Sequence, residues 1–464
     1  MLVMKFGGTS IGSAQGMRAV AEIIQRTWRE HPQLAVVVSA MSGVTDQLTD
    51  AARAAAEGRM EECEGIQASL LDRHMGVCQE LLADADQGQA MRTFIAERMA
   101  ELERFCQSIA VMGEVTVRGL DMVSAIGEKL SAAILSALLR AQGVPAEWMD
   151  ASQMLVTDDR FGAANPLLAE TRDRLEERVR PLMERGLIPV ITGYIGATSE
   201  GVPTTLGRGG GDYSAAIIGA CLEADEVWIW SDVDGILTAD PNLVHEARTL
   251  EELSYVEAAE LAYFGAEVLH PKTIKPLEER GIPLRILNTF NPDHPGTLIV
   301  KKPSAERPRT RAIISTRGLS LLTVQGSDDA WTPQMAARAL SCLGRGGVEV
   351  LMFTQSFSER NLSLVVRLGD TRSSLRLLRQ EFANELDRGL VAPLEGGQEV
   401  STISVVGGPG EDGQGVVPRA FAALGGRGMT VISTVQASSE YNVSFVVPEA
   451  EMAATVRLLH RELM

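Results

Sequence analysis

Short apolar runs alternate with longer helical patterns from the N-terminus to about residue 300. Helical patterns begin near Ser13 and Thr45, each shortly after an apolar run. The runs are Leu2–Phe6, Leu34–Ser39, Leu187–Thr192 and Glu226–Ser231. The last two runs are rich in strand-forming residues and bounded by Gly or Asp, which is typical of strands buried on both faces. The pattern therefore predicts an α/β layer sandwich with a mostly parallel sheet.

Two segments interrupt this alternation. From Glu57 to Glu114 the sequence is helical and rich in charges, so we expect a helical excursion beside the sheet. The stretch VKKPSAERPRTR, from Val300 to Arg311, is polar, carries two prolines and has no hydrophobic period. It predicts a linker, and hence a domain boundary near residue 300.

The remainder of the chain contains an internal repeat. A displacement of 81 residues, from Val324 to Val405, also aligns Gln355 with Gln436 and the surrounding TQSFSERNLSLVV with VQASSEYNVSFVV. Each copy predicts strand, helix, strand, strand and helix, a small α+β module of the split βαβ kind. The second copy lacks a final strand before the sequence ends. We expect the segment AIIS, residues 312–315, to supply it and to interlock the two modules.

Composition and charge exclude several classes of protein. The 464 residues include 43 Lys and Arg against 61 Asp and Glu, a net charge of −18, which argues against nucleic-acid binding by charge. Five cysteines without a C-x-x-C pair suggest free core thiols in a reducing compartment. No basic leader and no long uncharged apolar run occur. We therefore expect a cytoplasmic protein with no membrane partner.

The first candidate site is KFGGTS, where a predicted strand ends on Lys5 and turns through Gly7 and Gly8 toward a helix. Such a turn lets backbone N–H groups approach phosphate oxygens while the lysine ammonium supplies a positive charge. A tight strand-to-helix turn with an incidental lysine is the alternative. The sequence has no G-x-x-x-x-G-K-[ST] motif, which excludes the standard P-loop.

The second candidate site is GRGGGDYS, which begins at Gly207 and precedes a helical pattern from Ala215. Four glycines around Arg208 permit close approach of the backbone to a ligand, and the guanidinium can hold a carboxylate or phosphate with two hydrogen bonds. A flexible hairpin loop is the alternative, with Asp212 serving only as a helix cap.

Two further motifs carry carboxylates. Gly127-Glu128 opens a predicted helix that runs to Arg140, where a glutamate either compensates the helix dipole or meets a ligand. Ser231 and Asp232 stand at the carboxyl end of a predicted strand, where open α/β sheets bind ligands. A simple turn would also explain the second motif.

Taken together and in this order, the motifs resemble the aspartate kinase family over essentially the whole chain. The segments that carry the resemblance are KFGGTS from Lys5, SAMSGVTD from Ser39, GEKLSAA from Gly127, GRGGGDYSAA from Gly207, SDVDGILTADP from Ser231, GAEVLHPKTIKP from Gly265 and NTFNPDHPGTLI from Asn288. The paired repeat segments extend it into two ACT modules, which in that family sense small molecules and form dimers.

The resemblance implies an α/β amino-acid kinase fold, a three-layer α/β/α sandwich over residues 1–299, and a linker over 300–311. Two tandem α+β, ferredoxin-like ACT modules would follow at 312–395 and 396–464, and they would form a homodimer. No dehydrogenase segment follows in the sequence given, so we expect a monofunctional chain.

The implied reaction transfers a phosphoryl group from ATP to L-aspartate and yields 4-phospho-L-aspartate and ADP. This is the first step of lysine, threonine and methionine biosynthesis in the family. A side-chain carboxylate is already an anionic nucleophile, so positioning and charge neutralisation suffice without a general base. Mg²⁺ would be held mainly by the nucleotide phosphates, with no protein metal site.

By position, the resemblance assigns Lys5 to neutralising the transferring phosphoryl group and Asp212 to organising that lysine. Arg208 would hold the substrate α-carboxylate and Glu128 its α-ammonium. Further contacts would come from Ser39 and Thr45 to the substrate, and from Gly7, Gly8, Ser231, Asp232 and Lys272 to the nucleotide.

Several positions depart from the family pattern. Gly211 stands where a serine is usual, and Leu237 and Asn242 replace a tyrosine and an arginine near the nucleotide. Glu267 replaces a nucleotide-facing lysine, and Lys272 is the candidate to supply the missing charge.

The resemblance also bears on feedback inhibition. Leu351 matches the position of an acidic residue that receives the effector's ammonium groups in lysine-inhibited relatives, and an apolar side chain cannot do so. The Gln-x-x-Ser-Glu pattern is more similar to that of threonine-inhibited kinase–dehydrogenase fusions. We therefore expect Gln355 and Gln436 to contact an amino-acid effector, with threonine favoured over lysine. A structural role for both glutamines is the alternative.

Two other functions remain open on the sequence alone. The same fold could serve a kinase for glutamate, acetylglutamate, carbamate or a nucleoside monophosphate, although Glu128 and Arg208 favour a zwitterionic amino acid. Alternatively, the chain could be a degenerate kinase that only senses amino acids, as the departures at Leu237, Asn242 and Glu267 suggest.

Overall fold

The computed structural model describes residues 1–83, 85–263, 269–304, 310–327, 332–356, 358–407, 415–436 and 442–464. These residues form two compact units. The first contains residues 1–236, 249–262 and the described residues up to Ser304. The second contains residues 237–248, Tyr263 and the described residues from Thr310 onward. Residues 237–248, expected within a continuous first domain, therefore group with the second unit.

An eight-stranded sheet forms the centre of the first unit, in the order β3-β5-β2-β1-β8-β10-β11-β9. Neighbouring strands from β3 to β10 are parallel, as are β11 and β9, whereas β10 and β11 pair antiparallel. The strands are β1 (Leu2–Phe6), β2 (Leu34–Val38), β3 (Ala146–Met149), β5 (Ile188–Thr192), β8 (Glu226–Ser231), β9 (Glu252–Ser254), β10 (Leu284–Asn288) and β11 (Thr297–Val300). The predicted mostly parallel sheet is confirmed.

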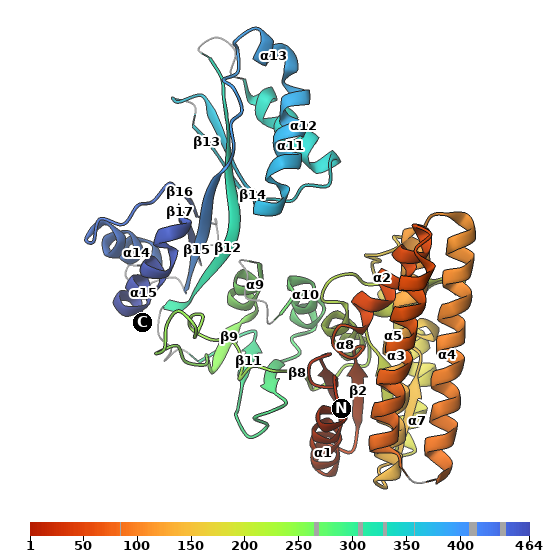
Figure 1. Ribbon diagram of the computed structural model, residues 1–464. Coiled ribbons are helices and arrows are strands. Elements are labelled where there is room, and N and C mark those ends of the chain that lie inside the picture. Colours follow the sequence, from red (N-terminus) through yellow and green to blue (C-terminus); the bar gives the residue numbers. More distant parts are fainter. Residues whose placement is uncertain are drawn as a thin grey trace. The chain divides into compact units, whose positions relative to one another are not determined.

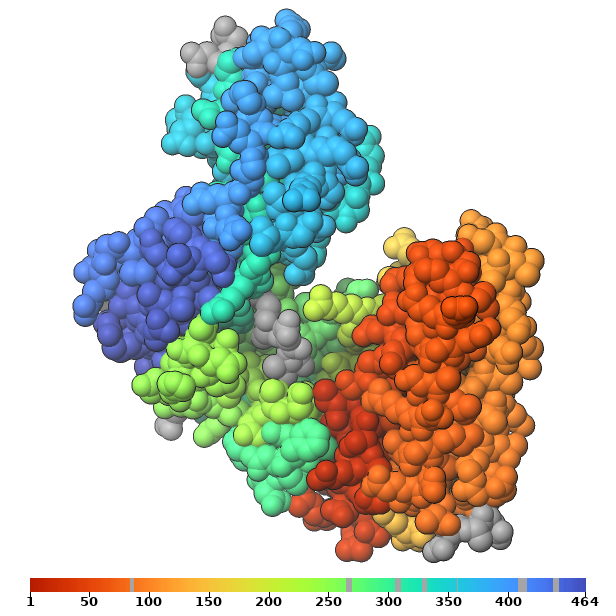
Figure 2. All heavy atoms as spheres, viewed as in Figure 1, coloured from red at the N-terminus to blue at the C-terminus, as the bar shows by residue number. Residues whose placement is uncertain are grey.

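A smaller sheet joins β4 (Val156–Thr157), β6 (Ile195–Thr198) and β7 (Pro203–Thr205). The helices of the first unit are α1 (Ala14–Glu30), α2 (Val44–Ala56), α3 (Met60–Leu81), α4 (Ala85–Met112), α5 (Val117–Ala141), α6 (Leu168–Arg178), α7 (Arg180–Glu184), α8 (Gly210–Cys221), α9 (Tyr255–Tyr263) and α10 (Pro271–Arg280). The long helices α3 and α4 form the expected helical excursion, drawn orange in Figure 2.

Helix α5 belongs to the core of the first unit. Within the described residues, it is the one helix that is long and apolar enough to cross a membrane. However, 89% of its apolar window is buried inside the protein, as in the core helix of a globular fold.

Strand β1 shows how the sheet positions a functional side chain. All five of its residues are buried. Met4 and Phe6 belong to the large apolar cluster that also contains residues of α1 and α5. Because alternate side chains of a strand point to opposite faces, Lys5 projects the other way, where it meets Asp212 in the first turn of α8.

The second unit contains a six-stranded antiparallel sheet in the order β13-β14-β12-β15-β17-β16. Its strands are β12 (Thr310–Gln325), β13 (Val350–Ser356), β14 (Asn361–Arg367), β15 (Gln398–Gly407), β16 (Ser433–Gln436) and β17 (Asn442–Pro448). Its helices are α11 (Pro333–Arg345), α12 (Thr371–Glu381), α13 (Ala383–Asp387), α14 (Val416–Gly425) and α15 (Met452–Leu463). The predicted order of strand, helix, strand, strand and helix occurs twice.

Strand β12 is shared by the two modules. Its N-terminal part pairs with β15, where Ala312 lies opposite Val406, and its C-terminal part pairs with β14, where Leu322 lies opposite Leu364. Figure 1 shows β12 and β15 as long neighbouring strands. The segment AIIS thus supplies the strand that the second copy lacks, as the sequence suggested.

Residues 237–248 pack into the core of the second module. Thr238 accepts a hydrogen bond from the N–H of Ile313 at 2.8 Å, and its hydroxyl lies 3.1 Å from Nε2 of His460. Ala239 and Val244 join an apolar cluster with residues of β15, β17 and α15. A connection between two strands of the first unit therefore forms part of the second unit's core.

The five cysteines are buried and form no disulfide in the part of the chain that the structure describes, which includes all five. They are Cys63, Cys78, Cys106, Cys221 and Cys342. The prediction of free core thiols is confirmed.

Candidate functional site

A cavity of about 490 Å³ lies in the first unit, beyond the carboxyl ends of β1 and β2. Its lining includes seven of the residues selected from the sequence: Lys5, Gly8, Ser39, Thr45, Glu128, Arg208 and Asp212. These residues come from four separate stretches of the chain. The sequence showed these residues as members of separate motifs, and the structure places them around one cavity.

The parallel pairing of β1 and β2 places two of these stretches side by side. Phe6 lies opposite Val38, so the loops that follow both strands leave the same edge of the sheet. The approach is close, because a Cβ added to Gly8 would lie 2.8 Å from the carbonyl oxygen of Ala40. Only glycine fits this backbone without a shift.

Lys5 and Asp212 form a shielded ion pair in this cavity. The Lys5 Nζ and an Asp212 carboxylate oxygen are 2.5 Å apart, and the two side chains are 10% and 15% exposed. Helix α8 begins at Gly210, and Gly209 occupies its cap position at φ 74°, without a capping side chain among the described residues. Asp212 therefore lies inside the first turn, so the alternative that it serves only as a helix cap is wrong.

Glu128 lies in the middle of α5. The sequence suggested that it opens a helix, but α5 begins at Val117, where Thr116 caps it by accepting the N–H of Gly119. The expected helix start at residue 127 is therefore wrong. A dipole effect fades within the first turn, so it cannot explain a carboxylate at this position.

The environment of Glu128 is unusual for a carboxylate. The residue is 2% exposed, and its Oε1 accepts the N–H of Ala40 at 3.2 Å. Among the described residues, Oε2 is buried and has no hydrogen-bond partner. Burial raises the pKa of Glu128 to about 8, against the opposing effect of the hydrogen bond from Ala40. A buried carboxylate oxygen with no partner is suited to receive a cationic group of a ligand.

Arg208 lies in the glycine loop at the cavity, with an exposed side chain. Its neighbours Gly207 and Gly209 have φ of 75° and 74°, a backbone conformation that suits glycine. Ser39 and Thr45 are half-buried at the opposite loop. The lining of the cavity thus combines a guanidinium, a buried carboxylate and two hydroxyl groups.

Gly7, Ser231 and Asp232 lie outside the cavity lining, at the adjoining strand ends. The N–H of Gly7 donates to the carbonyl oxygen of Trp230 at 3.2 Å, which links the ends of β1 and β8. The hydroxyl of Ser231 donates to Asp232 at 3.1 Å. These three residues form a group beside Lys5 that faces the same edge of the sheet.

Lys272 is exposed at the start of α10, and its N–H donates to Nδ1 of His270 at 3.2 Å. The His270 ring borders the glycine loop, because a Cβ added to Gly209 would lie 2.5 Å from the His270 Cβ. Glu267 lies outside the described residues, so its relation to Lys272 stays a prediction.

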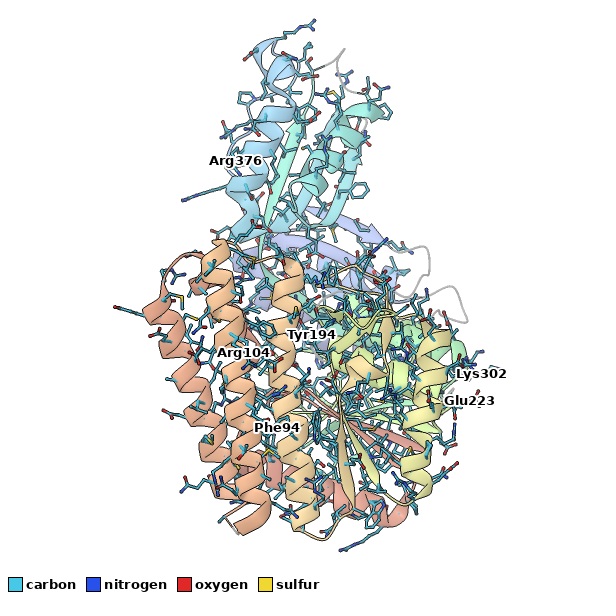
Figure 3. All side chains as sticks on the ribbon, turned by 90° about the vertical axis from the view of Figure 1, so that its right-hand side faces the viewer. Phe94, Arg104, Tyr194, Glu223, Lys302 and Arg376 are labelled. Atoms are coloured by element: carbon cyan, nitrogen blue, oxygen red, sulfur yellow. The ribbon has the colours of Figure 1, made fainter. Side chains whose placement is uncertain are left out.

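Two residues of this region were not expected from the sequence. Tyr194 lines the cavity at φ 67°, and its N–H donates to the hydroxyl of Ser214 at 2.9 Å; Figure 3 labels it. Asp121 is 3% exposed and lies seven residues before Glu128, on the same face of α5. That spacing was a readable signal, whereas nothing in the sequence marked the strained backbone of Tyr194.

The two glutamines lie in the second unit. Gln355 is on β13 and Gln436 ends β16, and the amide nitrogen of Gln355 is buried without a partner among the described residues. Although β13 and β16 end the strand order, the hydroxyls of Thr354 and Ser433 are 3.2 Å apart. The edges that carry the glutamines therefore touch.

Comparison with family models gives one long match in the N-terminal part of the chain and two short matches in the C-terminal part. Residues 1–288 match the amino acid kinase family, and residues 322–382 and 403–463 each match the ACT domain.

Comparison with known proteins gives matches along the whole chain. It is 34% identical over 464 residues to the bifunctional aspartokinase/homoserine dehydrogenase 2 of Arabidopsis thaliana, covering 99% of this chain and 50% of that protein. The chain thus spans about half the length of the curated bifunctional relatives it matches. It is 33% identical to Arabidopsis thaliana aspartokinase 1, covering 99% of this chain and 79% of that protein.

Solved structures match over the same length. E. coli aspartokinase III in complex with aspartate and ADP is 29% identical, with a TM-score of 0.81, covering 100% of this chain and 99% of that one. The same protein in complex with lysine and aspartate gives a TM-score of 0.82 at the same identity and coverage.

Proposed function

Because the chain belongs to the aspartokinases, within the amino acid kinase family, we propose that it transfers a phosphoryl group from ATP to the side-chain carboxylate of L-aspartate. The products would be 4-phospho-L-aspartate and ADP. The proposal rests on one observation: the Lys5–Asp212 pair, Glu128 and Arg208 all line the same cavity. The aspartate and ADP bound by the E. coli relative support it.

Two charged groups would hold the backbone end of the substrate. Glu128 would receive the α-ammonium on Oε2, the buried oxygen without a partner among the described residues. Arg208 would bind the α-carboxylate through its planar guanidinium. Ser39 and Thr45 would hydrogen-bond the substrate from the opposite wall. The side-chain carboxylate of the substrate would then point toward Lys5.

Charge neutralisation would dominate the transfer step. Lys5, held by Asp212, would offset the negative charge that spreads over the phosphoryl oxygens. The first turn of α8, with Gly210 and Gly211 at the cavity, adds backbone N–H groups and the positive end of a helix dipole. No proton has to be removed from a carboxylate nucleophile, so no general base is required.

The nucleotide would bind beside Lys5, along the adjoining strand ends, at Gly7, Gly8, Ser231, Asp232 and Lys272. Within the described residues, no group of three or more His, Cys, Asp or Glu side chains could hold a metal ion. Mg²⁺ would be carried mainly by the nucleotide phosphates, where it shields their charge. We propose a cytoplasmic location, which suits five free thiols.

The test is ADP release from Mg-ATP with a panel of acceptors: L-aspartate, L-glutamate, acetylglutamate, carbamate and a nucleoside monophosphate. We expect turnover with aspartate at least about a hundredfold above that with the other acceptors. An acceptor that lacks an α-ammonium, or places it elsewhere, would leave Glu128 unpaired. Turnover with one of the other acceptors but not with aspartate would show that this acceptor is the substrate. Folded protein without turnover, but stabilised by an amino acid, would indicate a sensor.

We also propose that the ACT modules bind threonine in preference to lysine and join two chains into a homodimer. The buried amide of Gln355 without a partner among the described residues supports an effector contact there, with Gln436 on the touching edge. Leu351 packs beside an apolar cluster, which offers nothing to an effector's ammonium group. The lysine bound by the E. coli relative makes lysine the competitor to exclude.

Inhibition by threonine and lysine should be measured on the same enzyme, with Gln355→Ala and Gln436→Ala beside it. We expect threonine to inhibit the wild type and each substitution to raise the inhibitory concentration about tenfold, as loss of a buried hydrogen bond predicts. Inhibition by lysine but not by threonine would refute the argument that Leu351 prevents lysine from binding. Light scattering of the full chain tests the dimer.

A further inference from the structure

Asp121 is a buried carboxylate that the proposed chemistry does not use. One of its oxygens accepts the hydroxyl of Thr205 at 2.6 Å, and the other accepts the N–H of Gly162 at 2.8 Å. Burial raises the pKa of Asp121, and these hydrogen bonds oppose the rise. Burying a carboxylate costs free energy unless it is hydrogen-bonded. Thr205 and Gly162 must therefore stay in position to offset that cost.

The two partners belong to segments that form the cavity. Gly162 lines it directly, and Thr205 ends β7 only three residues before Arg208. The segments also fit against each other, since a Cβ added to Gly207 would lie 3.0 Å from the carbonyl oxygen of Gly162. Asp121 therefore ties both segments to α5.

Helix α5 also carries Glu128, seven residues further along and on the same face. An amino acid presents its α-ammonium and α-carboxylate from one carbon atom, so the groups that receive them need a fixed separation. The hydrogen bond between Asp121 and Thr205 joins α5 to the segment that leads to Arg208. It fixes that separation because it anchors the loop that carries Arg208 to the helix that carries Glu128.

We infer that Asp121 is a positioning residue: through Thr205 and Gly162 it sets the distance between Arg208 and Glu128, and with it the affinity for the amino-acid substrate. This inference rests on the proposed function and deepens it. Asp121 does not line the cavity and touches no reacting atom.

Thr205→Val tests the tie with little change of shape, and Thr205→Ser restores the hydroxyl. Thr171→Val is the matched control, because Thr171 is also 0% exposed and its hydroxyl bonds to the backbone of Val156, away from the cavity lining. We expect Thr205→Val to raise the aspartate KM about tenfold while kcat and the Mg-ATP KM change less than about threefold. Thr205→Ser should return the aspartate KM to within about twofold of wild type.

Asp121→Asn should shift the aspartate KM in the same direction. Hydrogen exchange of full-length protein supplies a readout that needs no turnover. Peptides that cover residues 158–165 and 203–208 should exchange faster in Thr205→Val and Asp121→Asn than in wild type. Thr455→Val, which removes a buried hydroxyl that donates to the carbonyl oxygen of Glu451 in the second unit, should leave both peptides at the wild-type rate.

The outcomes separate the inference from the proposed function. A wild-type chain without aspartate turnover refutes the function, and unchanged exchange of the two segments then refutes the inference as well. If the wild type phosphorylates aspartate, an unchanged KM in Thr205→Val, no rescue by serine, or an equal KM rise in Thr171→Val overturns the inference and leaves the function intact.

Discussion

The raised pKa of Glu128 predicts a specific pH dependence of substrate capture. If Glu128 receives the α-ammonium as a carboxylate, the free enzyme must lose a proton before aspartate binds. Burial raises the pKa of this group to about 8. At pH 7 roughly one Glu128 in ten is then ionised, and at pH 6 roughly one in a hundred. The apparent kcat/KM for aspartate should rise about tenfold per pH unit between 6 and 7.5 and level off above pH 8.

The assay is kcat/KM for aspartate at saturating Mg-ATP from pH 6 to 8.5, in wild type and Glu128→Gln. The glutamine removes the charge, so the rise with pH should disappear, and kcat/KM at pH 8.5 should fall about a hundredfold, as loss of a charge-assisted hydrogen bond predicts. Glu101→Gln is the control, because Glu101 is a partly shielded carboxylate paired with Arg98 on α4, outside the cavity lining. A flat wild-type profile, or the same rise in Glu128→Gln, would refute the reasoning.

The same shift has a consequence for stability. A folded-state pKa of about 8, above the ordinary 4.5, means that the folded protein favours the protonated form. Stability is therefore lost as the pH rises from about 4.5 to about 8. Glu128→Gln should melt at the wild-type temperature at pH 4.5 and at a higher temperature at pH 8. A lower melting temperature at pH 8 would contradict the assigned direction.

Three further predictions concern charge and backbone. Lys5→Met should lower kcat at least about a hundredfold with a smaller change in either KM, since the lysine acts on developing charge; a kcat near wild type would remove it from that role. Arg208→Lys should raise the aspartate KM about tenfold because the planar fork is lost, and steady-state kinetics would show it. Gly296→Ala should cost about 3 kcal/mol of unfolding free energy in urea titration, because its φ is 69° and its Cβ would lie 1.9 Å from the carbonyl oxygen of Ile286. Gly281→Ala, at φ 68° with no described atom within 4 Å, should cost only about 1 kcal/mol, and equal costs would contradict the steric argument.

Strands of the parallel sheet were readable from the sequence because their signal is local. The runs proposed at Leu2–Phe6 and Glu226–Ser231 coincide with β1 and β8. The start of α1 was also readable, since Ser13 caps it by accepting the N–H of Gly16. In each case a few adjacent residues determine the element, so no distant contact was needed to place it.

The start of α5 was missed because the local sequence signal pointed to another residue. The motif around Glu128 drew attention to Gly127, and glycine often marks a helix end. In the structure Gly127 is needed inside the helix, because an added Cβ would lie 2.8 Å from the Ala40 Cβ. Its role is a close approach between α5 and the loop after β2, and this depends on residues far away in sequence.

The placement of residues 237–248 shows where local motifs stop being informative. The motif SDVDGILTADP is continuous in sequence, and its departures at Leu237 and Asn242 suggested a weakened nucleotide site. In the structure the chain changes units within this motif, after Ile236. The side chain of Asn242 is exposed and bonds to Asp240 at 3.0 Å, while Thr238 and Ala239 pack among residues of the second unit. Leu237 and Asn242 therefore lie in a segment of the second unit, and the contacts of that segment with the unit's apolar core come from other residues, Ala239 and Val244 among them.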